Sequence, residues 1–271
     1  MDYKIGIYEN SGNDLSDYQV RIEITDPSFF NKCTDQKYVE FYDEDQTTLL
    51  DHYTEEFDPA NNKAVFWVKV PFIPAGSTKI IYLNINTSRT EDLSDPEQVF
   101  DFWDDFEVLD TAKWSEDLSS GFVSEVANSM YKITIDTPPD SPKSGYIQSD
   151  IEKTDFAIEA KVTWDFKQND VHVRVLIEYN TNCFISVNDW SYTQNPHYRL
   201  RVDGNDYDTD YGTAPQSGSS VLKIVKLGDT VKGYYDDNLI ATVTSTTTMS
   251  YLKYAVTSDG LGGDYDPYGA I

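Results

Sequence analysis

The sequence predicts an all-β protein built from two antiparallel β-sandwich domains. Short segments in which apolar and polar residues alternate recur at spacings of about 8–12 residues, as the strands of sandwiches do. Glycine, proline, asparagine and aspartate separate these segments, where turns require them. No long stretch has helical periodicity. A chain of 271 residues can bury two separate cores, so we place the domains at residues 1–98 and 99–271.

The first predicted domain starts with a hairpin whose turn is the polar stretch at residues 10–13. Residues 26–33 carry a short helical turn, and residues 58–62 form a loop rich in breakers. The predicted strands are residues 3–8, 18–24, 38–42, 49–57, 63–70 and 78–84. Residues 87–98 are polar and contain Pro96, a composition typical of a surface linker, and this sets the domain boundary near residue 98.

The second predicted domain opens with an aromatic and acidic run at residues 99–107, whose alternation predicts a first strand. The Asp104-Asp105 pair lies near the end of that strand, where carboxylates can meet a loop or an ion. Further strands are predicted at residues 121–126, 130–136, 146–149, 156–164, 171–179, 183–188, 198–202, 221–226, 230–235, 239–244 and 251–258. This antiparallel series favours a sandwich over any α/β arrangement.

The net charge of −26, with a pI near 4.2, argues against nucleic-acid binding, because phosphate recognition depends on clustered lysine and arginine. Anionic membranes are disfavoured for the same reason. No apolar run approaches the roughly 20 residues of a membrane-spanning helix, so membrane insertion is not expected. Divalent cations are one way to relieve such self-repulsion locally, and a solvated acidic surface is the alternative.

Cys33 and Cys183 fall on opposite sides of the predicted boundary, and we expect two buried, unpaired thiols. The chain begins on a strand-like pattern and stops at Ile271, so we expect it to be part of a longer extracellular or cell-surface protein whose signal or anchor lies elsewhere. Asn86-Thr-Ser88 matches the glycosylation acceptor pattern and is compatible with that setting.

The first domain resembles a domain of unknown function that is common in large archaeal and bacterial surface proteins. The matching motifs cover most of residues 3–100: Leu15-Ser-Asp-Tyr-Gln-Val20, Val39-Glu-Phe-Tyr-Asp43, Ala64-Val-Phe-Trp-Val-Lys-Val-Pro71 and Gly76-Ser-Thr-Lys-Ile-Ile-Tyr-Leu83. The resemblance implies a small β-sandwich and no particular activity.

The second domain resembles the concanavalin A-like, laminin-G-type jelly roll. The motifs are Phe102-Trp-Asp-Asp-Phe106, Phe156-Ala-Ile-Glu-Ala-Lys-Val162, Leu222-Lys-Ile-Val225 and Val231-Lys-Gly-Tyr-Tyr-Asp-Asp-Asn-Leu239. Members of that family usually close with one more strand after a glycine-rich loop, and this chain stops where that strand should begin. A missing closing strand would leave an open edge that a neighbouring chain could complete.

Two acidic segments are candidate calcium sites, because calcium takes six to eight oxygen ligands. The first has carboxylates at alternating positions, Asp206, Asp208 and Asp210. It is not an EF-hand, since Tyr211 and Ser217 stand where the turn glycine and the closing glutamate are required, and a solvated acidic hairpin is the alternative.

The second acidic segment, residues 259–266, combines glycines with Asp264 and Asp266. The resemblance implies a structural calcium where such a terminal loop meets the first strand, which would add Asp104 or Asp105. The alternative is a flexible terminal loop without a metal.

Sugar binding requires exposed aromatic faces beside hydrogen-bonding side chains. The polar segment at residues 188–195 offers Trp190 and Tyr192, with three tyrosines expected nearby: Tyr198, Tyr207 and Tyr211. Packing beneath a loop is the alternative for Trp190. The other tryptophans lie within strand patterns and are predicted to be core residues: Trp67, Trp103, Trp114 and Trp164.

Catalysis has less support. Glycosidases need two carboxylates at the scissile bond, and related hydrolases carry them as Glu-x-Asp-x-Glu on one strand, whereas Glu159 is followed two places on by Lys161 and Glu178 by Asn180. The histidines, His52, His172 and His197, are dispersed and accompany no nucleophile motif.

We therefore expect a non-catalytic binding or adhesion segment that recognises a polysaccharide or glycan and holds structural calcium. A second hypothesis is a structural spacer or assembly subunit of a surface layer, filament or viral fibre, which would bind neighbouring protein chains. A third is a polysaccharide hydrolase or lyase.

Overall fold

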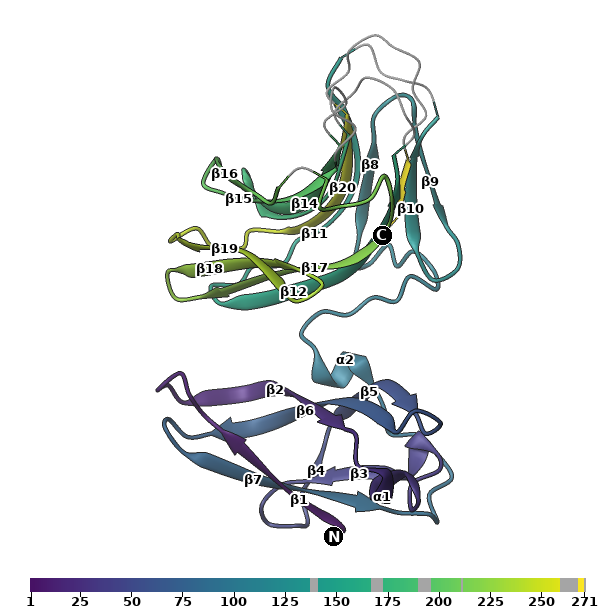
Figure 1. Ribbon diagram of the computed structural model, residues 1–271, viewed down its shortest axis with the longest axis vertical. Helices are drawn as coiled ribbons and strands as arrows, with labels where there is room; N and C mark the ends of the chain where they lie inside the picture. Colours follow the sequence, from purple (N-terminus) through teal and green to yellow (C-terminus); the bar gives the residue numbers. More distant parts are fainter. Residues whose placement is uncertain (137–140, 167–172, 190–195, 211, 259–267, 271) are drawn as a thin grey trace. The chain divides into compact units, whose positions relative to one another are not determined.

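The computed structural model (Figure 1) describes residues 1–136, 141–166, 173–189, 196–210, 212–258 and 268–270. The chain divides into two compact units, Met1–Asp104 and Asp105–Ile271. Almost all of the elements are strands, and the strands pair antiparallel, which confirms the predicted all-β class. In the part of the chain that the structure describes, no helix is both long and apolar enough to cross a membrane.

The first unit is a sandwich of a four-stranded and a three-stranded sheet (Figure 1). The four-stranded sheet has the order β1 (Tyr3–Tyr8), β7 (Thr78–Ile85), β3 (Val39–Tyr42) and β4 (Leu49–Leu50). The three-stranded sheet has the order β2 (Leu15–Ile24), β6 (Lys63–Ile73) and β5 (His52–Asp58). Between β2 and β3 lie the short helix α1 (Pro27–Phe30) and a 3-10 turn (Gln36–Tyr38). The predicted helical turn is therefore present.

Alternating apolar residues fill the space between these two sheets. Phe29, Phe41, Phe66, Val68 and Leu83 are buried there together with the free thiol of Cys33. Helix α1 begins at an N-cap aspartate, Asp26, whose carboxylate accepts a hydrogen bond from the backbone N–H of Ser28, and this cap positions Phe29 and Phe30 over the core. Burial raises the pKa of Cys33 to about 11, which keeps the thiol protonated.

A buried carboxylate, Glu40, connects β3 to β7 and to the segment that follows β7. Its oxygens accept hydrogen bonds from Asn84 Nδ2 (3.1 Å), Asn86 Nδ2 (2.9 Å), Arg89 Nε (2.7 Å) and Tyr42 Oη (3.0 Å). The side-chain nitrogen of Asn86 is the atom that glycosylation would modify, and here it donates to a buried acceptor. The glycosylation pattern at Asn86 is thus part of a structural network.

The run at residues 99–107 was predicted to be a strand, and that prediction is wrong. Helix α2 (Pro96–Val99) ends within it, and no strand follows until β8 (Ser115–Leu118). Phe100 and Trp103 pack instead against β5 and β6 of the first unit, with ring centroids 5.5 Å apart for Phe100–Trp67 and 4.9 Å for Trp103–Tyr53. Trp67 and Trp103 are therefore half-buried on the outer side of a sheet and are not core residues.

The division after Asp104 follows from this packing. The carbonyls of Gln98 and Val99 accept hydrogen bonds from the side chains of Lys69 and Gln19, so the segment is fixed to the three-stranded sheet. The first unit therefore extends beyond the predicted boundary at residue 98. Beyond the division, Phe106 packs against Trp114 and Tyr131 of the second unit.

The second unit is a sandwich of two seven-stranded sheets (Figure 1). The β12 sheet has the order β19 (Asn238–Thr244), β18 (Thr230–Tyr235), β17 (Ser217–Leu227), β12 (Phe156–Asp165), β21 (Tyr268–Ala270), β10 (Tyr131–Ile135) and β9 (Phe122–Val126). The β14 sheet has the order β16 (Asn205–Asp208), β15 (His197–Val202), β14 (Cys183–Asp189), β13 (Val173–Asn180), β20 (Leu252–Ser258), β11 (Lys143–Ser149) and β8. This is the predicted jelly roll.

The inner faces of these sheets supply the second core. Its buried residues include Trp164, Ile133, Ile147, Val162, Val175, Ile177, Leu200, Leu222, Ile224 and Val256. Cys183 is a buried free thiol, so both cysteines are unpaired as predicted. The sequence left open whether a closing strand is present, and β21 pairs with β10 on one side and with β12 on the other.

Candidate functional site

The outer face of the β14 sheet presents side chains in three rows that run across the strands. The central row has one residue from each strand: Asp117, Tyr146, Ala255, Leu176, Ser186, Arg199 and Asp208. One flanking row contains Gln148, Lys253, Glu178, Phe184, Arg201 and Asp206. The other contains Ser144, Thr257, Arg174, Asn188 and His197. The face is therefore largely polar and charged.

Strand alternation sets the direction of these side chains. Leu200 points into the sandwich, because a Cβ placed on Gly233 of β18 would lie 2.8 Å from Leu200 Cδ1. Its neighbours Arg199 and Arg201 must then point outward. Figure 1 shows the sheets of this unit curved, with the outer face of the β14 sheet on the concave side. The three rows thus line a concave surface.

Several polar side chains on this outer face are buried. Ser186 and His197 have no exposed surface, Asn188 is 2% exposed and Arg199 is 7% exposed. Ser186 Oγ donates to Asn188 Oδ1 (2.9 Å), and Asn188 Nδ2 lies 3.5 Å from His197 Nε2. Burying such groups costs free energy unless they are hydrogen-bonded, so the network is a specific feature of the sheet.

Arg199, which lies opposite Ser186, binds two aspartates on the edge strand β16, and one of them, Asp208, has its Oδ1 3.8 Å from His197 Nε2. Its guanidinium donates from Nε to Asp208 Oδ1 (2.6 Å) and from Nη2 to Asp208 Oδ2 (2.8 Å). Its Nη1 lies 3.2 Å from Asp206 Oδ2. Both oxygens of Asp208 are engaged by one planar group, and this bidentate arrangement fixes the positions of all the atoms involved.

A second polar group lies towards the other end of the same face. Lys253 Nζ is 2.9 Å from Glu178 Oε1 and lies over the rings of Tyr146 (5.2 Å to the centroid) and Tyr251 (5.0 Å). Tyr251 donates a hydrogen bond to Glu178, and burial together with this bond raises the pKa of Tyr251. Tyr146 donates to Asp117 Oδ2 (3.0 Å), which raises the pKa of Tyr146.

Between these two polar groups the floor of the face is made of small or apolar side chains. Leu176, Phe184 and Ala255 are at most 5% exposed and form one cluster, against which Tyr146 packs. The hydroxyl oxygen of Thr257, in the neighbouring row, is buried and has no hydrogen-bond partner. An unpartnered buried hydroxyl is costly, and a ligand or water at this face would satisfy it.

Two of the five predicted sugar-binding residues lie on the inner side of the β14 sheet. Tyr198 is 3% exposed and stacks on Tyr235 with ring centroids 4.0 Å apart, and burial raises its pKa. Tyr207 pairs with Leu200 and shares its inward direction. Neither ring can form the outer platform that the sequence predicted, because strand alternation places both towards the core. Trp190, Tyr192 and Tyr211 lie outside the described residues.

The predicted calcium ligands Asp206 and Asp208 form ion pairs with arginines. They lie on β16 opposite Arg201 and Arg199, so the alternating carboxylates form cross-strand ion pairs. Asp210 is exposed beyond the end of that strand. The structure shows no group of three or more histidine, cysteine, aspartate or glutamate side chains suited to a metal within its described ranges.

Of the other proposed calcium ligands, the structure describes Asp105 but not Asp264 or Asp266. Asp105 is exposed, and its Oδ1 accepts a hydrogen bond from the backbone N–H of Glu107 (3.1 Å). Asp264 and Asp266 fall outside the described part of the chain, so calcium at the terminal loop stays a prediction.

Ser186 and Asn188 of the network, and the neighbouring Thr257, were not among the site residues predicted from the sequence. The sequence does carry one signal for the arginine–aspartate pairs. Asp203-Gly204 is a strong turn pattern, and two arginines before it and two aspartates after it are each spaced two residues apart. Folding the chain at this turn places Arg199 opposite Asp208. The positions on β13, β14 and β20 carry no such signal, because they meet only when distant strands pair.

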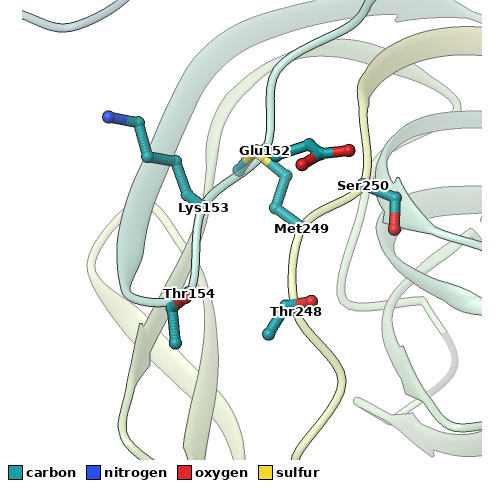
Figure 2. A pocket seen from close by; sticks show the side chains of 6 residues that line it. All are labelled: Glu152, Lys153, Thr154, Thr248, Met249 and Ser250. Atoms are coloured by element: carbon teal, nitrogen blue, oxygen red, sulfur yellow. The ribbon is translucent and has the colours of Figure 1, made fainter.

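A second candidate is a polar pocket of about 350 Å³ between the segments that precede β12 and β20 (Figure 2). Backbone hydrogen bonds in both directions between Lys153 and Met249 join the segments (3.2 and 2.9 Å). Figure 2 shows the Lys153 side chain directed away from the other labelled side chains. Met249 is buried, whereas Glu152 and Ser250 are exposed. Because this pocket holds few fixed polar groups, the outer face of the β14 sheet is the stronger site.

Comparison with solved structures finds distant likenesses. A β-glucanase of Bacillus licheniformis is 11% identical over 62% of this chain and 94% of its own, with a TM-score of 0.45. The laminarinase catalytic domain of Thermotoga maritima is 12% identical over 62% of this chain and 94% of its own, with a TM-score of 0.45. A carbohydrate-binding module of Bacillus subtilis, CBM66, is 13% identical over 58% of this chain and 90% of its own, with a TM-score of 0.35. Likenesses this distant carry no argument about function.

No curated protein matches the sequence significantly. A family match is found for residues 35–117, which fit the sequence profile of the domain of unknown function DUF2341. This range covers most of the first unit from the 3-10 turn onward and the start of the second. The chain therefore carries a DUF2341 match in residues 35–117 together with a jelly-roll sandwich in its second unit.

Proposed function

We propose that the second unit is a non-catalytic glycan-binding module and that its ligand lies against the outer face of the β14 sheet. The observation that carries this proposal is the buried polar network of Ser186, Asn188, His197 and Arg199 on the solvent side of a sheet. A solvent-facing side of a sheet does not need buried, mutually fixed donors and acceptors for stability. A binding surface does, because fixed polar groups lose little entropy when a ligand binds.

The chemistry of this face suits sugar hydroxyls. A hydroxyl group both donates and accepts, so it can bridge a free lone pair of a carboxylate and the donor of a neighbouring side chain. Asp206, Asp208 and Asn188 offer such groups on the same face as the floor that includes Leu176 and Ala255. Sugar rings also have apolar faces, for which the floor and the ring of Tyr146 are suitable partners.

The state of the carboxylates on this face supports binding without catalysis. Glycoside hydrolysis needs one carboxyl group that holds a proton and a second that faces the scissile bond. Glu178 is bound to Lys253 and Tyr251, and Asp208 to Arg199, so these two carboxylates are paired with cations. Asp117 accepts a hydrogen bond from Tyr146. Incubation with glycans and analysis of reducing ends tests this part of the proposal, and turnover would contradict it.

We place the protein outside the cell or on its surface, in keeping with an acidic surface and a glycan ligand. Calcium at the loop containing Asp264 and Asp266 belongs to the same proposal. Within a larger surface protein, a module of this kind would hold the parent to a polysaccharide, and the partner would be the glycan itself.

Titration calorimetry against a panel of soluble polysaccharides tests the binding site. We expect Asn188→Ala and Ser186→Ala to weaken binding about tenfold each, as the loss of one hydrogen bond would. Ser219→Ala is the matched control, since Ser219 is exposed on β17 of the other sheet. Glu152→Gln tests the pocket of Figure 2 in the same way. Equal affinities for all four variants and the parent chain would contradict the assigned face.

A further inference from the structure

We infer that the ligand of this face is a neutral glycan, free of uronate, sulfate and phosphate groups. The inference rests on the proposed function and adds the chemical class of the sugar. The inference follows from the equal numbers of cationic and acidic side chains in the three rows. The rows contain four cationic side chains and four acidic ones: Arg174, Arg199, Arg201 and Lys253, and Asp117, Glu178, Asp206 and Asp208.

The arginine that would be the natural anchor for an anionic sugar already has an aspartate at each of its three side-chain nitrogens. Arg199 uses Nε and Nη2 for the two oxygens of Asp208, and its Nη1 is directed at Asp206. Its side chain is 8% exposed. A uronate or sulfate could use the guanidinium fork only by displacing an aspartate that is held at 2.6 and 2.8 Å.

The remaining cations are occupied in a similar way. Arg201 donates from Nη2 to the carbonyl of Gly204 (3.2 Å), and its guanidinium lies over the ring of Phe184. Its Nε lies 3.5 Å from Asp206, an ion-pair distance, but has no hydrogen-bond partner. Lys253 is paired with Glu178, and its Nζ lies over two tyrosine rings. Arg174 has an interaction partner as well.

A charged glycan would therefore meet a locally neutral face on a protein whose net charge is −26. The protein as a whole repels a polyanion, and no unpaired cation in the three rows compensates for that repulsion. Neutral hydroxyl groups need no counter-charge. They can use the carboxylate lone pairs that the arginines leave open and the buried hydroxyl of Thr257.

The test compares a neutral β-glucan, a neutral mannan, a polyuronate and a sulfated glycosaminoglycan by calorimetry with the full chain. Each is measured at about 20 mM and about 500 mM NaCl, because salt screens charge-dependent binding. We expect a neutral glycan to bind with an affinity that changes less than about twofold between the two salt concentrations, and the charged glycans to bind at least about tenfold more weakly.

Tighter binding of a charged glycan, with a strong salt dependence, would overturn this inference and leave the binding function in place. Binding of none of the four would overturn the proposed function as well. A charge variant sharpens the test: Asp208→Asn should increase affinity for the polyuronate at least threefold, whereas Asp210→Asn, which removes the same charge beyond β16, should not. Equal behaviour of these two variants would show that charge pairing does not set the selectivity.

Discussion

Arg199 and Asp208 occupy opposite positions on β15 and β16, and two hydrogen bonds of 2.6 and 2.8 Å join the guanidinium to both oxygens of the carboxylate. The side chain of Arg199 is 8% exposed and that of Asp208 is 27% exposed. The cost in stability of breaking this pair should therefore lie between the costs for a surface ion pair and for a buried one.

Asp208→Ala should lower the free energy of unfolding by about 1–2 kcal/mol, because Arg199 would keep only Asp206 as a partner. The double variant Arg199→Met, Asp208→Leu should recover part of this loss, since it leaves no buried charge without a partner. Urea unfolding of the single and double variants measures both effects. A double variant that is less stable than Asp208→Ala would contradict the argument.

Glu40→Gln should destabilise the first unit by about 3 kcal/mol. The carboxylate is 1% exposed, and the substitution would leave the charge of Arg89 without its partner. Glu44→Gln is the matched control, because the Glu44 side chain is 65% exposed and its nearest cation is 3.9 Å away. That control should change stability by less than about 0.5 kcal/mol. Denaturant unfolding compares the two, and similar losses would refute the role of Glu40.

His52 should make the stability of the chain depend on pH. The ring is 1% exposed, and burial lowers its pKa from 6.5 to about 4. The folded state therefore holds fewer protons than the unfolded state between these values, so stability falls as pH falls from about 6.5 towards 4.

Between pH 7.5 and pH 5 this loss should amount to about 2 kcal/mol, and it should be absent in His52→Leu. The window avoids the titration of paired carboxylates such as Glu9, whose hydrogen bonds lower its pKa to about 2. Unfolding titrations at the two pH values measure the difference. A His52→Leu chain with the same pH dependence as the parent chain would show that another group is responsible.

Gly145→Ala should destabilise the second unit by about 1–3 kcal/mol through overpacking. A Cβ at this position would lie 2.9 Å from Phe122 Cδ1, 3.0 Å from Leu118 Cδ2 and 3.1 Å from Ile133 Cγ2. Gly6→Ala is the control, since its nearest contact would be an ordinary 3.6 Å to Thr78 Cγ2. Thermal melts should show a lower melting temperature for Gly145→Ala alone, and an unchanged melt for that variant would disprove the crowding.

Calcium should raise the melting temperature if the loop containing Asp264 and Asp266 binds it, because a ligand that binds only the folded state stabilises that state. Melts with calcium and with a chelator measure this shift. Asp206→Asn should leave the shift unchanged, since Asp206 pairs with Arg199 and Arg201. Identical melts in calcium and chelator would remove calcium from the proposal.

The fold was accessible from the sequence where local pattern decides structure. Alternation along residues 63–70 and the turn at Asp203-Gly204 are visible in the chain itself, and both features are found. The strand predicted at residues 99–107 was wrong because the alternation of residues does not show which part of the protein they pack against. Phe100 and Trp103 are drawn to the outer side of β5 and β6 by contacts with residues more than 30 positions away.

The residues of the candidate site were harder to predict from the sequence than the strands, for a related reason. Tyr198 and Tyr207 belong to strands, so their direction depends on register, and one residue of difference moves a ring from the surface to the core. Arg199 and Asp208 could be paired by counting from the turn. Ser186, Leu176 and Ala255 come together only through the order of strands in the sheet, which no local pattern specifies.

The position of β21 has a consequence for how the second unit is made. This strand comes near the end of the chain, yet it lies between β10 and β12, in the interior of its sheet. During synthesis, the two flanking strands leave the ribosome more than 100 residues before the strand that joins them. The first unit pairs β1 with β7 by Ile85 and can fold early, whereas the second unit can complete its β12 sheet only after β21 has been synthesised.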